Sequence, residues 1–260
     1  MTDSKKIKSV NIICIKWGEY YTSDDVNKLF RATTRNFKEH SVNFYCFTDR
    51  QNGLDTAIHI RDLPNLRSDK FAYRKEAGLC DNNLGGLTGQ RVIYFDLDSV
   101  ICGKLDRLID FMNTDEPYIT RDYGRDSDKI GGSNLYSWVV GTLGYIKDHY
   151  ETNADAVISE FGTASQEFLS AQIIEKYGRL NFYPNEWHLS FKKHCLRKWP
   201  LNFLLEAKKP SSEALLVNFH GDPKVNDAAK GSWSTRLKIP FYKRLYKFTK
   251  PTSWIADHWY

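Results

Sequence analysis

Long apolar runs are absent from this sequence, and its cysteines are few and scattered. None of its 260 residues lie in a run that approaches the ~18 consecutive apolar residues of a membrane-spanning helix. Residues 1–8 are mostly polar and lead into an apolar stretch, unlike a secretory signal peptide. The five cysteines form no Cys-x-x-Cys pair, and no Asn-x-Ser/Thr glycosylation site occurs. These absences favour a cytoplasmic protein with reduced thiols.

A strong excess of charge of either sign is also lacking. The 37 basic and 32 acidic residues leave a net charge of +5, which by itself does not indicate a nucleic-acid partner, and none is expected. Hydrophobic residues make up 41% of the chain and aromatic residues 14%, enough for a packed core. The length allows one large domain or two small ones.

Apolar runs alternate with helix-like segments along the first hundred residues. Strands are predicted over residues 10–15, 42–47 and 91–95, and helices over 23–37 and 68–79, with Ser23 as the first helix cap. This order predicts a parallel sheet with helices on its faces, whose ligands bind at the carboxyl ends of the strands. The second half predicts strands over 117–120, 138–143 and 215–219, a polar loop over 122–133 and a helix over 166–177.

Two aspartates one residue apart, Asp96 and Asp98, follow the third predicted strand. In an extended chain they lie on the same side, where their charges repel each other. A hard divalent cation with oxygen ligands, Mn²⁺ or Mg²⁺, relieves this repulsion. The pattern also occurs in surface turns, but the end of a buried strand is a poor place for unpaired charge. We therefore predict that the pair holds the metal of a metal-diphosphate ligand.

A second polar group follows the strand predicted over 215–219. His220 alone is typical of a structural histidine, but beside two carboxylates its imidazole is a suitable ligand for Mn²⁺. Gly221 allows close approach of a ligand to the backbone. Lys224 offers a positive charge to phosphate oxygens.

Together these motifs resemble glycosyltransferases of the GT-A fold. The chain is most similar to family eight, which includes glycogenin and lipooligosaccharide galactosyltransferases, and to related bacterial nucleotide-sugar transferases. The resemblance runs from about Val10 to Lys224 and continues at residues 254–259. It is most specific at Asp96-Leu97-Asp98, Ser165-Gln166-Glu167 and 219–224. It implies an α/β, Rossmann-like catalytic domain over residues 1–230, with a mixed sheet and helices on both faces. It also implies metal-dependent, retaining transfer of a hexose from a nucleotide diphosphate, such as a UDP-sugar, to a glycan or glycolipid hydroxyl.

The resemblance also implies roles for individual residues. Asp96, Asp98 and His220 are expected to bind the metal. Gln166 matches a glutamine that lies near the transferring sugar, and Asp122, in the polar loop, is a second candidate for contact with the sugars. Donor contacts are expected from Ile15, Lys16, Trp17, Tyr21, Arg74, Lys75, Asp96, Gly221 and Lys224. Ser165 stands where the family has an aspartate.

Two other functions fit parts of the pattern. Residues 95–100 resemble the nucleophile motif of haloacid dehalogenase-type phosphatases, with Asp96 as nucleophile and Asp98 as acid. The two strand-helix units that precede this motif argue against that reading. A non-catalytic nucleotide- or glycan-binding relative is favoured by Ser165.

The segment 231–260 is predicted to be distinct from the catalytic domain. Between Gly231 and Lys250 it carries six basic residues, no acid and many interleaved aromatic residues. Such a stretch suits the anionic surface of a bilayer, which would place the protein on the inner face of the membrane. A helix packed on the domain with its charges in water is the alternative.

Overall fold

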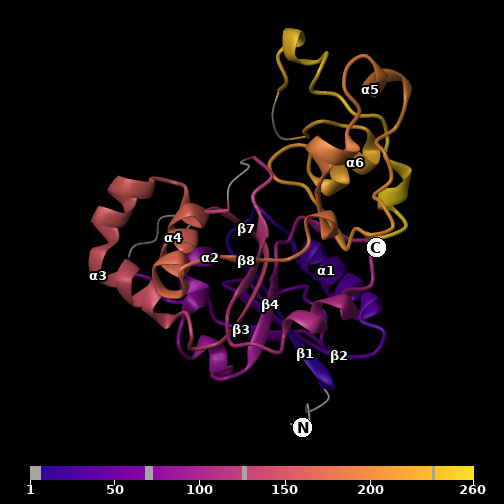
Figure 1. Cartoon of the computed structure of the whole chain (residues 1–260). Coiled ribbons are helices and arrows are strands. Elements are labelled where there is room, and N and C mark those ends of the chain that lie inside the picture. The colour runs from indigo at the N-terminus through magenta and orange to yellow at the C-terminus, as the bar shows by residue number, and fades with distance from the viewer. Residues whose placement is uncertain (1–6, 68–72, 125–127, 236–237) are drawn as a thin grey trace.

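A seven-stranded mixed sheet forms the centre of the molecule (Figure 1). The computed structural model describes residues 7–67, 73–124, 128–235 and 238–260. The strands of this sheet are β1 (Ser9–Lys16), β2 (Ser41–Thr48), β3 (His59–Arg61), β4 (Arg91–Phe95), β6 (Tyr118–Arg121), β7 (Gly131–Val139) and β8 (Asn181–Phe182). Their order is β3-β2-β1-β4-β7-β6-β8. β1, β2, β3 and β4 run parallel, whereas β7 is antiparallel to both β4 and β6, so the predicted mixed sheet is confirmed.

A smaller three-stranded sheet adjoins the first. It consists of β5 (Ser99–Ile101), β9 (His188–Ser190) and β10 (Leu216–Asn218), with β10 in the middle. β10 pairs antiparallel with β5 and parallel with β9. The chain leaves the large sheet at Phe95 and enters the small one at Ser99, so Asp96 and Asp98 lie at the crossing between the two sheets.

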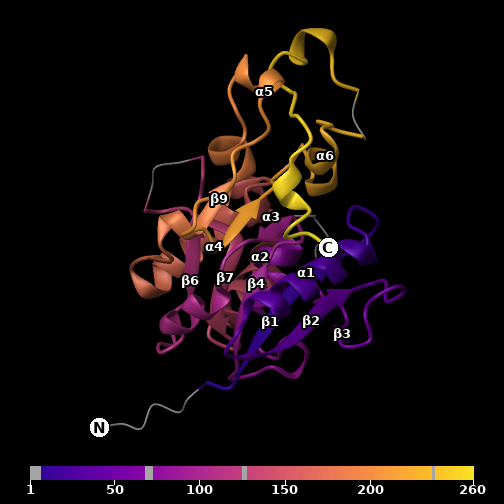
Figure 2. The ribbon, with the colours of Figure 1, turned by 90° about the vertical axis from the view of Figure 1, so that its right-hand side faces the viewer.

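Helices cover both faces of the large sheet, as expected (Figures 1 and 2). The covering helices are α1 (Ser23–Asn36) on one face and α2 (Tyr73–Glu76), α3 (Gly144–Phe161) and α4 (Ser165–Tyr177) on the other. The short helices α5 (Leu201–Leu204) and α6 (Val225–Lys230) lie beyond the large sheet, near the C-terminal segment (Figure 1). Along β1, Ile12 and Cys14 pack into a core with α1, while Ile13 and Ile15 pack into a second core with α2, α3 and α4. This alternation follows from the two-residue period of a strand that is buried on both faces.

The last residues of the chain return to the first core. Trp254, Ile255 and Trp259 are buried there, and Arg35 of α1 donates a hydrogen bond to the carbonyl of His258 over 2.7 Å. The carboxyl terminus therefore lies beside α1, as both views show. The segment predicted over 231–260 thus ends in a well-packed stretch. Among the helices that the structure describes, none is long and apolar enough to cross a membrane.

The start of α1 differs from the prediction by one residue. Thr22, not Ser23, is the cap: its hydroxyl accepts a hydrogen bond from the amide of Asp25 over 3.3 Å. The carboxylate of Asp25 in turn accepts from the amide of Thr22 over 2.8 Å. This reciprocal pair is a capping box, which Ser23 could not form because it is already the first helical residue.

Other predicted boundaries also shift. Residues 68–72 of the helix predicted over 68–79 lie outside the described residues, and α2 ends at Glu76. The strand predicted over 138–143 begins at Gly131 and ends at Val139, so the loop predicted over 122–133 is shorter. α3 was not predicted; its mainly polar sequence and the non-helical backbone at Asn153 leave only a weak helical pattern.

Candidate active site

The carboxyl edge of the parallel strands carries a pocket of about 390 Å³, which we name the edge pocket. It is lined by Ile15, Trp17, Tyr20, Tyr21, Lys75, Glu76, Tyr94, Asp96 and Ser165. β1 and β4 are parallel neighbours, so the residues that follow them meet at the same edge. Five of the residues expected to contact a donor are brought together here: Ile15, Trp17, Tyr21, Lys75 and Asp96.

Asp96 lies in the edge pocket with a lysine as its counter-ion. Its carboxylate accepts hydrogen bonds from Lys75 Nζ over 3.2 Å, Asn134 Nδ2 over 3.0 Å and the hydroxyl of Tyr94 over 2.8 Å. Burial raises the pKa of Asp96, and the ammonium of Lys75 opposes that shift. Burial lowers the pKa of Lys75, but Asp96 and Glu76 outweigh it and raise this pKa above its ordinary value. Lys75 therefore stays charged beside the carboxylate.

Asp98 is almost fully buried and forms an ion pair with a different lysine, Lys224. Its Oδ2 accepts from Lys224 Nζ over 3.1 Å and from the hydroxyl of Tyr21 over 2.8 Å. Its Oδ1 accepts from Asn218 Nδ2 of β10 over 3.0 Å. Burial and both nearby aspartates raise the pKa of Tyr21, so the phenol keeps the proton that it donates. Each aspartate of the pair is thus neutralised by its own lysine.

The geometry of the aspartate pair differs from the extended chain that we predicted. β4 ends at Phe95, and the amide of Ser99 donates to the carbonyl of Asp96 over 3.1 Å. This bond closes a turn, so the alternation of a strand no longer decides where the side chains point. Asp98 lines a neighbouring pocket of about 250 Å³, which shares Tyr20 and Tyr21 with the edge pocket.

His220 follows β10 and stacks on the ring of Tyr123, with 5.6 Å between ring centroids. Its Nδ1 is buried and has no hydrogen-bond partner. Burial and the nearby charge of Lys192 lower the pKa of His220, which favours the neutral, metal-binding form. In the described part of the chain, no three Asp, Glu, His or Cys side chains form a ready-made metal site. Metal binding by Asp96, Asp98 and His220 therefore stays a prediction.

The two residues expected near the transferring sugar are in direct contact. Gln166 Nε2 donates to the carboxylate of Asp122 over 2.8 Å. Gln166 is at the start of α4, next to Ser165 of the edge pocket. Asp122 lines a second pocket of about 430 Å³, so the start of α4 touches one pocket directly and the other through Asp122.

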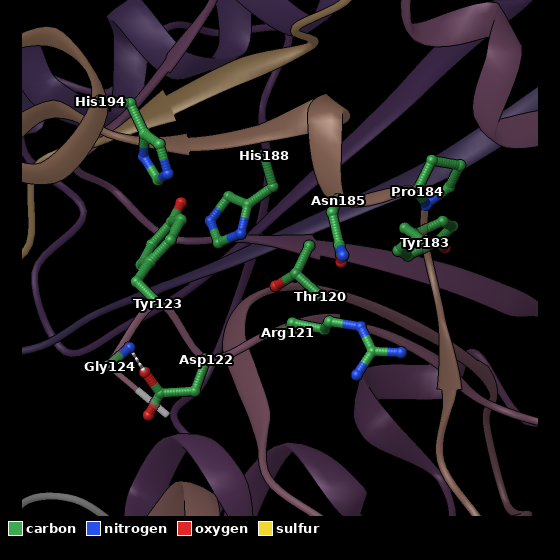
Figure 3. A pocket seen from close by; sticks show the side chains of 10 residues that line it. All are labelled: Thr120, Arg121, Asp122, Tyr123, Gly124, Tyr183, Pro184, Asn185, His188 and His194. Carbon is green, nitrogen blue, oxygen red and sulfur yellow. Dashed lines mark hydrogen bonds between the residues drawn. The ribbon is translucent and has the colours of Figure 1, made fainter. Parts of the chain in front are cut away.

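Figure 3 shows this second pocket, which we name the Tyr123 pocket. It is lined by Thr120, Arg121, Asp122, Tyr123, Gly124, Tyr183, Pro184, Asn185, His188 and His194. The ring of His188 lies 4.1 Å from that of Tyr123, and its buried Nε2 has no hydrogen-bond partner. Burial and the neighbouring imidazoles of His194 and His220 lower the pKa of His188 well below its ordinary value. A neutral imidazole with a free nitrogen can accept or donate one hydrogen bond.

Neither His188 nor Tyr123 was predicted as a site residue from the sequence. The only available signal was a histidine between Trp187 and Leu189 in a short apolar stretch, which also fits a structural role. The four other predicted donor residues do not line the edge pocket, and one of them, Lys224, lines the neighbouring pocket of Asp98. Lys16 is buried and directs its ammonium to the carbonyl of Gly18, and Arg74 belongs to α2. Gly221 has a φ of 68°, in the left-handed region that favours glycine.

Comparison with solved structures shows the same fold in several glycosyltransferases. The bifunctional glycosyltransferase WbbM gives a TM-score of 0.54 at 13% identity, over 84% of this chain and 47% of WbbM. The galactosyltransferase LgtC, solved with donor and acceptor sugar analogs, gives 0.53 at 11% identity, over 90% of this chain and 99% of LgtC. GlyE of Streptococcus pneumoniae TIGR4 gives 0.56 at 11% identity, over 84% of this chain and 56% of GlyE.

The chain has the GT-A fold of these glycosyltransferases. It spans about half the length of WbbM and GlyE. No protein-family model and no curated protein matches the sequence. The predicted fold class is therefore confirmed by structural likeness, while the phosphatase reading of Asp96 receives no support from it.

Proposed function

We propose that the protein is a metal-dependent glycosyltransferase. It transfers a sugar, with retention of configuration, from a nucleotide diphosphate such as UDP to a hydroxyl of a glycan or glycolipid. The observation that carries this proposal is the junction of two pockets at the start of α4. Ser165 lines the edge pocket, and Gln166 holds Asp122 of the Tyr123 pocket. Two substrates in these pockets would meet at that point.

The edge pocket suits a nucleotide diphosphate. Trp17, Tyr20 and Tyr21 offer aromatic surface for a planar base. Lys75 and Lys224 offer two ammonium groups for a diphosphate, and the ammonium of Lys224 lies 4.5 Å from the centre of the Tyr20 ring. These lysines would exchange their aspartate partners for phosphate oxygens when the donor binds. Asp96 and Asp98 would then be free to bind a cation.

The side chains that would bind the metal fit Mn²⁺. Two carboxylates and a neutral imidazole with an unpartnered, buried Nδ1 combine ligands that Mn²⁺ accepts, whereas imidazole suits Mg²⁺ less well. Asp96, Asp98 and His220 would hold the ion. When bound, it supplies positive charge to the leaving diphosphate.

The Tyr123 pocket suits the acceptor. His188 Nε2 is a buried polar atom without a partner, and Asn185 and Thr120 add polar groups for sugar hydroxyls. Gln166 fixes the orientation of the Asp122 carboxylate between the pockets. In the reaction, the bond between the sugar and the diphosphate breaks and a bond to the acceptor oxygen forms on the same face. The proton of the acceptor hydroxyl leaves with the nucleotide diphosphate.

Substitution of Asp98 tests the proposal. Wild-type protein is screened with UDP-sugars for Mn²⁺-dependent release of UDP. Asp98→Asn should lower that rate by at least ~10²-fold, because a charge that holds the cation is lost. Asp110→Asn, which removes an exposed carboxylate outside both pockets, is the matched control and should keep full activity. Full activity of Asp98→Asn, with an unchanged melting temperature, would refute the site assignment.

A non-catalytic relative is the second candidate, because Ser165 lines the edge pocket where the family has an aspartate. Calorimetry with UDP and Mn²⁺ distinguishes the two. Binding without turnover of any UDP-sugar would favour the non-catalytic function. Gain of turnover in Ser165→Asp would then assign the loss of activity to this residue.

A further inference from the structure

The edge pocket contains a second carboxylate besides that of Asp96. It belongs to Glu76, the last residue of α2, which is only 4% exposed. The hydroxyl of Ser133 on β7 donates a hydrogen bond to Glu76 Oε1 over 2.6 Å, and Lys75 Nζ lies 3.2 Å from the same oxygen. Both contacts use Oε1, so Oε2 has no partner among the residues that the structure describes. Because Glu76 lines the edge pocket, Oε2 is available to a ligand there.

Lys75 lies between the two carboxylates of the edge pocket. Its Nζ is 3.2 Å from Asp96 Oδ2 and 3.2 Å from Glu76 Oε1. One ammonium group therefore faces two carboxylates, while Lys224 is paired with Asp98. A carboxylate that is largely withdrawn from water is costly unless its oxygens are paired or hydrogen-bonded. The free Oε2 of Glu76 therefore points to a bound group that donates a hydrogen bond.

Glu76 belongs to the side of the edge pocket that adjoins α4. The helix α2 packs against α4 through the rings of Tyr73 and Phe168, which lie 5.7 Å apart. Ser165, the first residue of α4, lines the same pocket, and the proposed junction with the acceptor is at this helix start. The aromatic surface proposed for the base comes from residues 17–21, between β1 and α1. The position of Glu76 therefore favours the sugar, and not the base, as the part of the donor beside it.

The chemistry of a carboxylate leads to the same part of the donor. A carboxylate accepts hydrogen bonds and cannot donate them. A diphosphate likewise carries negative charge and acceptors, so Glu76 repels it, whereas a sugar hydroxyl can donate. We propose that Glu76 determines specificity for the donor by binding one hydroxyl of the transferred sugar through Oε2. Ser133 and Lys75 fix the orientation of the carboxylate through Oε1. This inference rests on the proposed function and adds that the donor sugar keeps this hydroxyl free.

Calorimetry of the full chain with Mn²⁺ tests the proposal. The probes are UDP, UDP-glucose, UDP-galactose and the singly deoxygenated analogues of the hexose that binds. Wild-type protein should bind one analogue about 10–100-fold more weakly than its parent, because a hydrogen bond to a charged group is lost. Glu76→Gln keeps an acceptor for Ser133 and should bind the parent and that analogue equally well. It should bind UDP no more weakly than wild type does. Glu160→Gln, at an exposed position on α3 outside both pockets, is the matched control and should keep the wild-type preference.

Three results would overturn the proposal. Equal binding of the parent and every deoxy analogue by wild-type protein would show that no hydroxyl is recognised, and this measurement needs no variant. The full loss with the same analogue in Glu76→Gln would assign the hydroxyl to another residue. Weaker binding of UDP itself by Glu76→Gln would show that Glu76 only positions Lys75 for the diphosphate. Failure of the proposed function would look different, because wild-type protein would then release no UDP from any UDP-hexose, whatever the binding measurements give.

Discussion

The sheet region, residues 7–182, and the C-terminal region, residues 183–260, are stabilised in different ways. The sheet region buries whole apolar strands, and one of the two hydrophobic cores lies entirely within it. The C-terminal region has short strands and turns, and large aromatic side chains such as Phe191 and Trp254 fill its interior. It also exposes most of the large apolar side chains that the described residues present to solvent.

This difference suggests a division of roles. The regular sheet places Asp96 and the wall of the edge pocket, because strand ends are fixed by hydrogen-bond register. The C-terminal region supplies the side chains that reach across to the aspartates, among them Asn218 and Lys224. The other hydrophobic core contains residues of both regions, from Val10 to Trp259, so we expect the regions to unfold together.

Trp254→Ala tests this coupling and should have the largest effect on stability. The indole is only 1% exposed, so its loss should lower the free energy of unfolding by about 3–5 kcal/mol. Circular dichroism and tryptophan fluorescence should report one common transition in urea. Trp199→Ala, at a side chain that is 61% exposed, should change stability by no more than about 0.5 kcal/mol. Two separate transitions in either variant would show that the regions are independent.

Lys224→Met tests whether the C-terminal region completes the active site. This lysine donates to Asp98 and lies over Tyr20 and Tyr21, so its loss removes a charge from the proposed diphosphate site. We expect kcat/KM for the UDP-sugar to fall about 10²–10³-fold. Lys230→Met, at an exposed position at the other end of α6, the helix that follows Lys224, is the matched control. Equal activity of the two variants would place the donor elsewhere.

The buried imidazole of His188 should make stability depend on pH. Because its pKa is lowered well below the ordinary value in the folded state, the unfolded chain binds a proton near pH 6.5 that the folded protein does not. Stability should therefore fall as pH drops below about 6.5, by up to about 1.4 kcal/mol per pH unit. Urea unfolding of wild type and His188→Gln between about pH 7.5 and 5.5 measures the difference. Parallel curves for the two proteins would contradict a neutral, buried His188.

The main strands of the large sheet were predictable from the sequence, because each of them is a continuous apolar segment of neighbouring residues. The apolar runs at 10–15, 42–47 and 91–95 correspond to β1, β2 and β4, since a strand buried on both faces needs a continuous apolar segment. The parallel order then placed Asp96 at the right edge. The helix over 166–177 was also predictable, because Gly178 ends α4 in a left-handed conformation.

Contacts between distant residues were not predictable. Lys224 is 126 residues from Asp98, and Asn202 is 46 residues from Phe248, so no spacing rule relates them. The extended geometry predicted for Asp96 and Asp98 was wrong. A backbone hydrogen bond from the amide of Ser99 to the carbonyl of Asp96 closes a turn there, so the two side chains do not follow the alternation of a strand. His188 gave no distinct pattern, because its free Nε2 is a property of the pocket and not of its neighbours in sequence.

Thr22→Ala should have the smallest effect and tests local structure in the sheet region alone. The threonine caps α1 through its bond to the amide of Asp25, so its loss should lower the free energy of unfolding by about 1 kcal/mol. Ser23→Ala is the control. Its hydroxyl donates to the carbonyl of Asn52 at an exposed site, and its loss should cost less than the loss of the cap. Urea unfolding measures both variants. A larger cost for Ser23→Ala would restore the sequence prediction that Ser23 is the cap and would contradict the capping box.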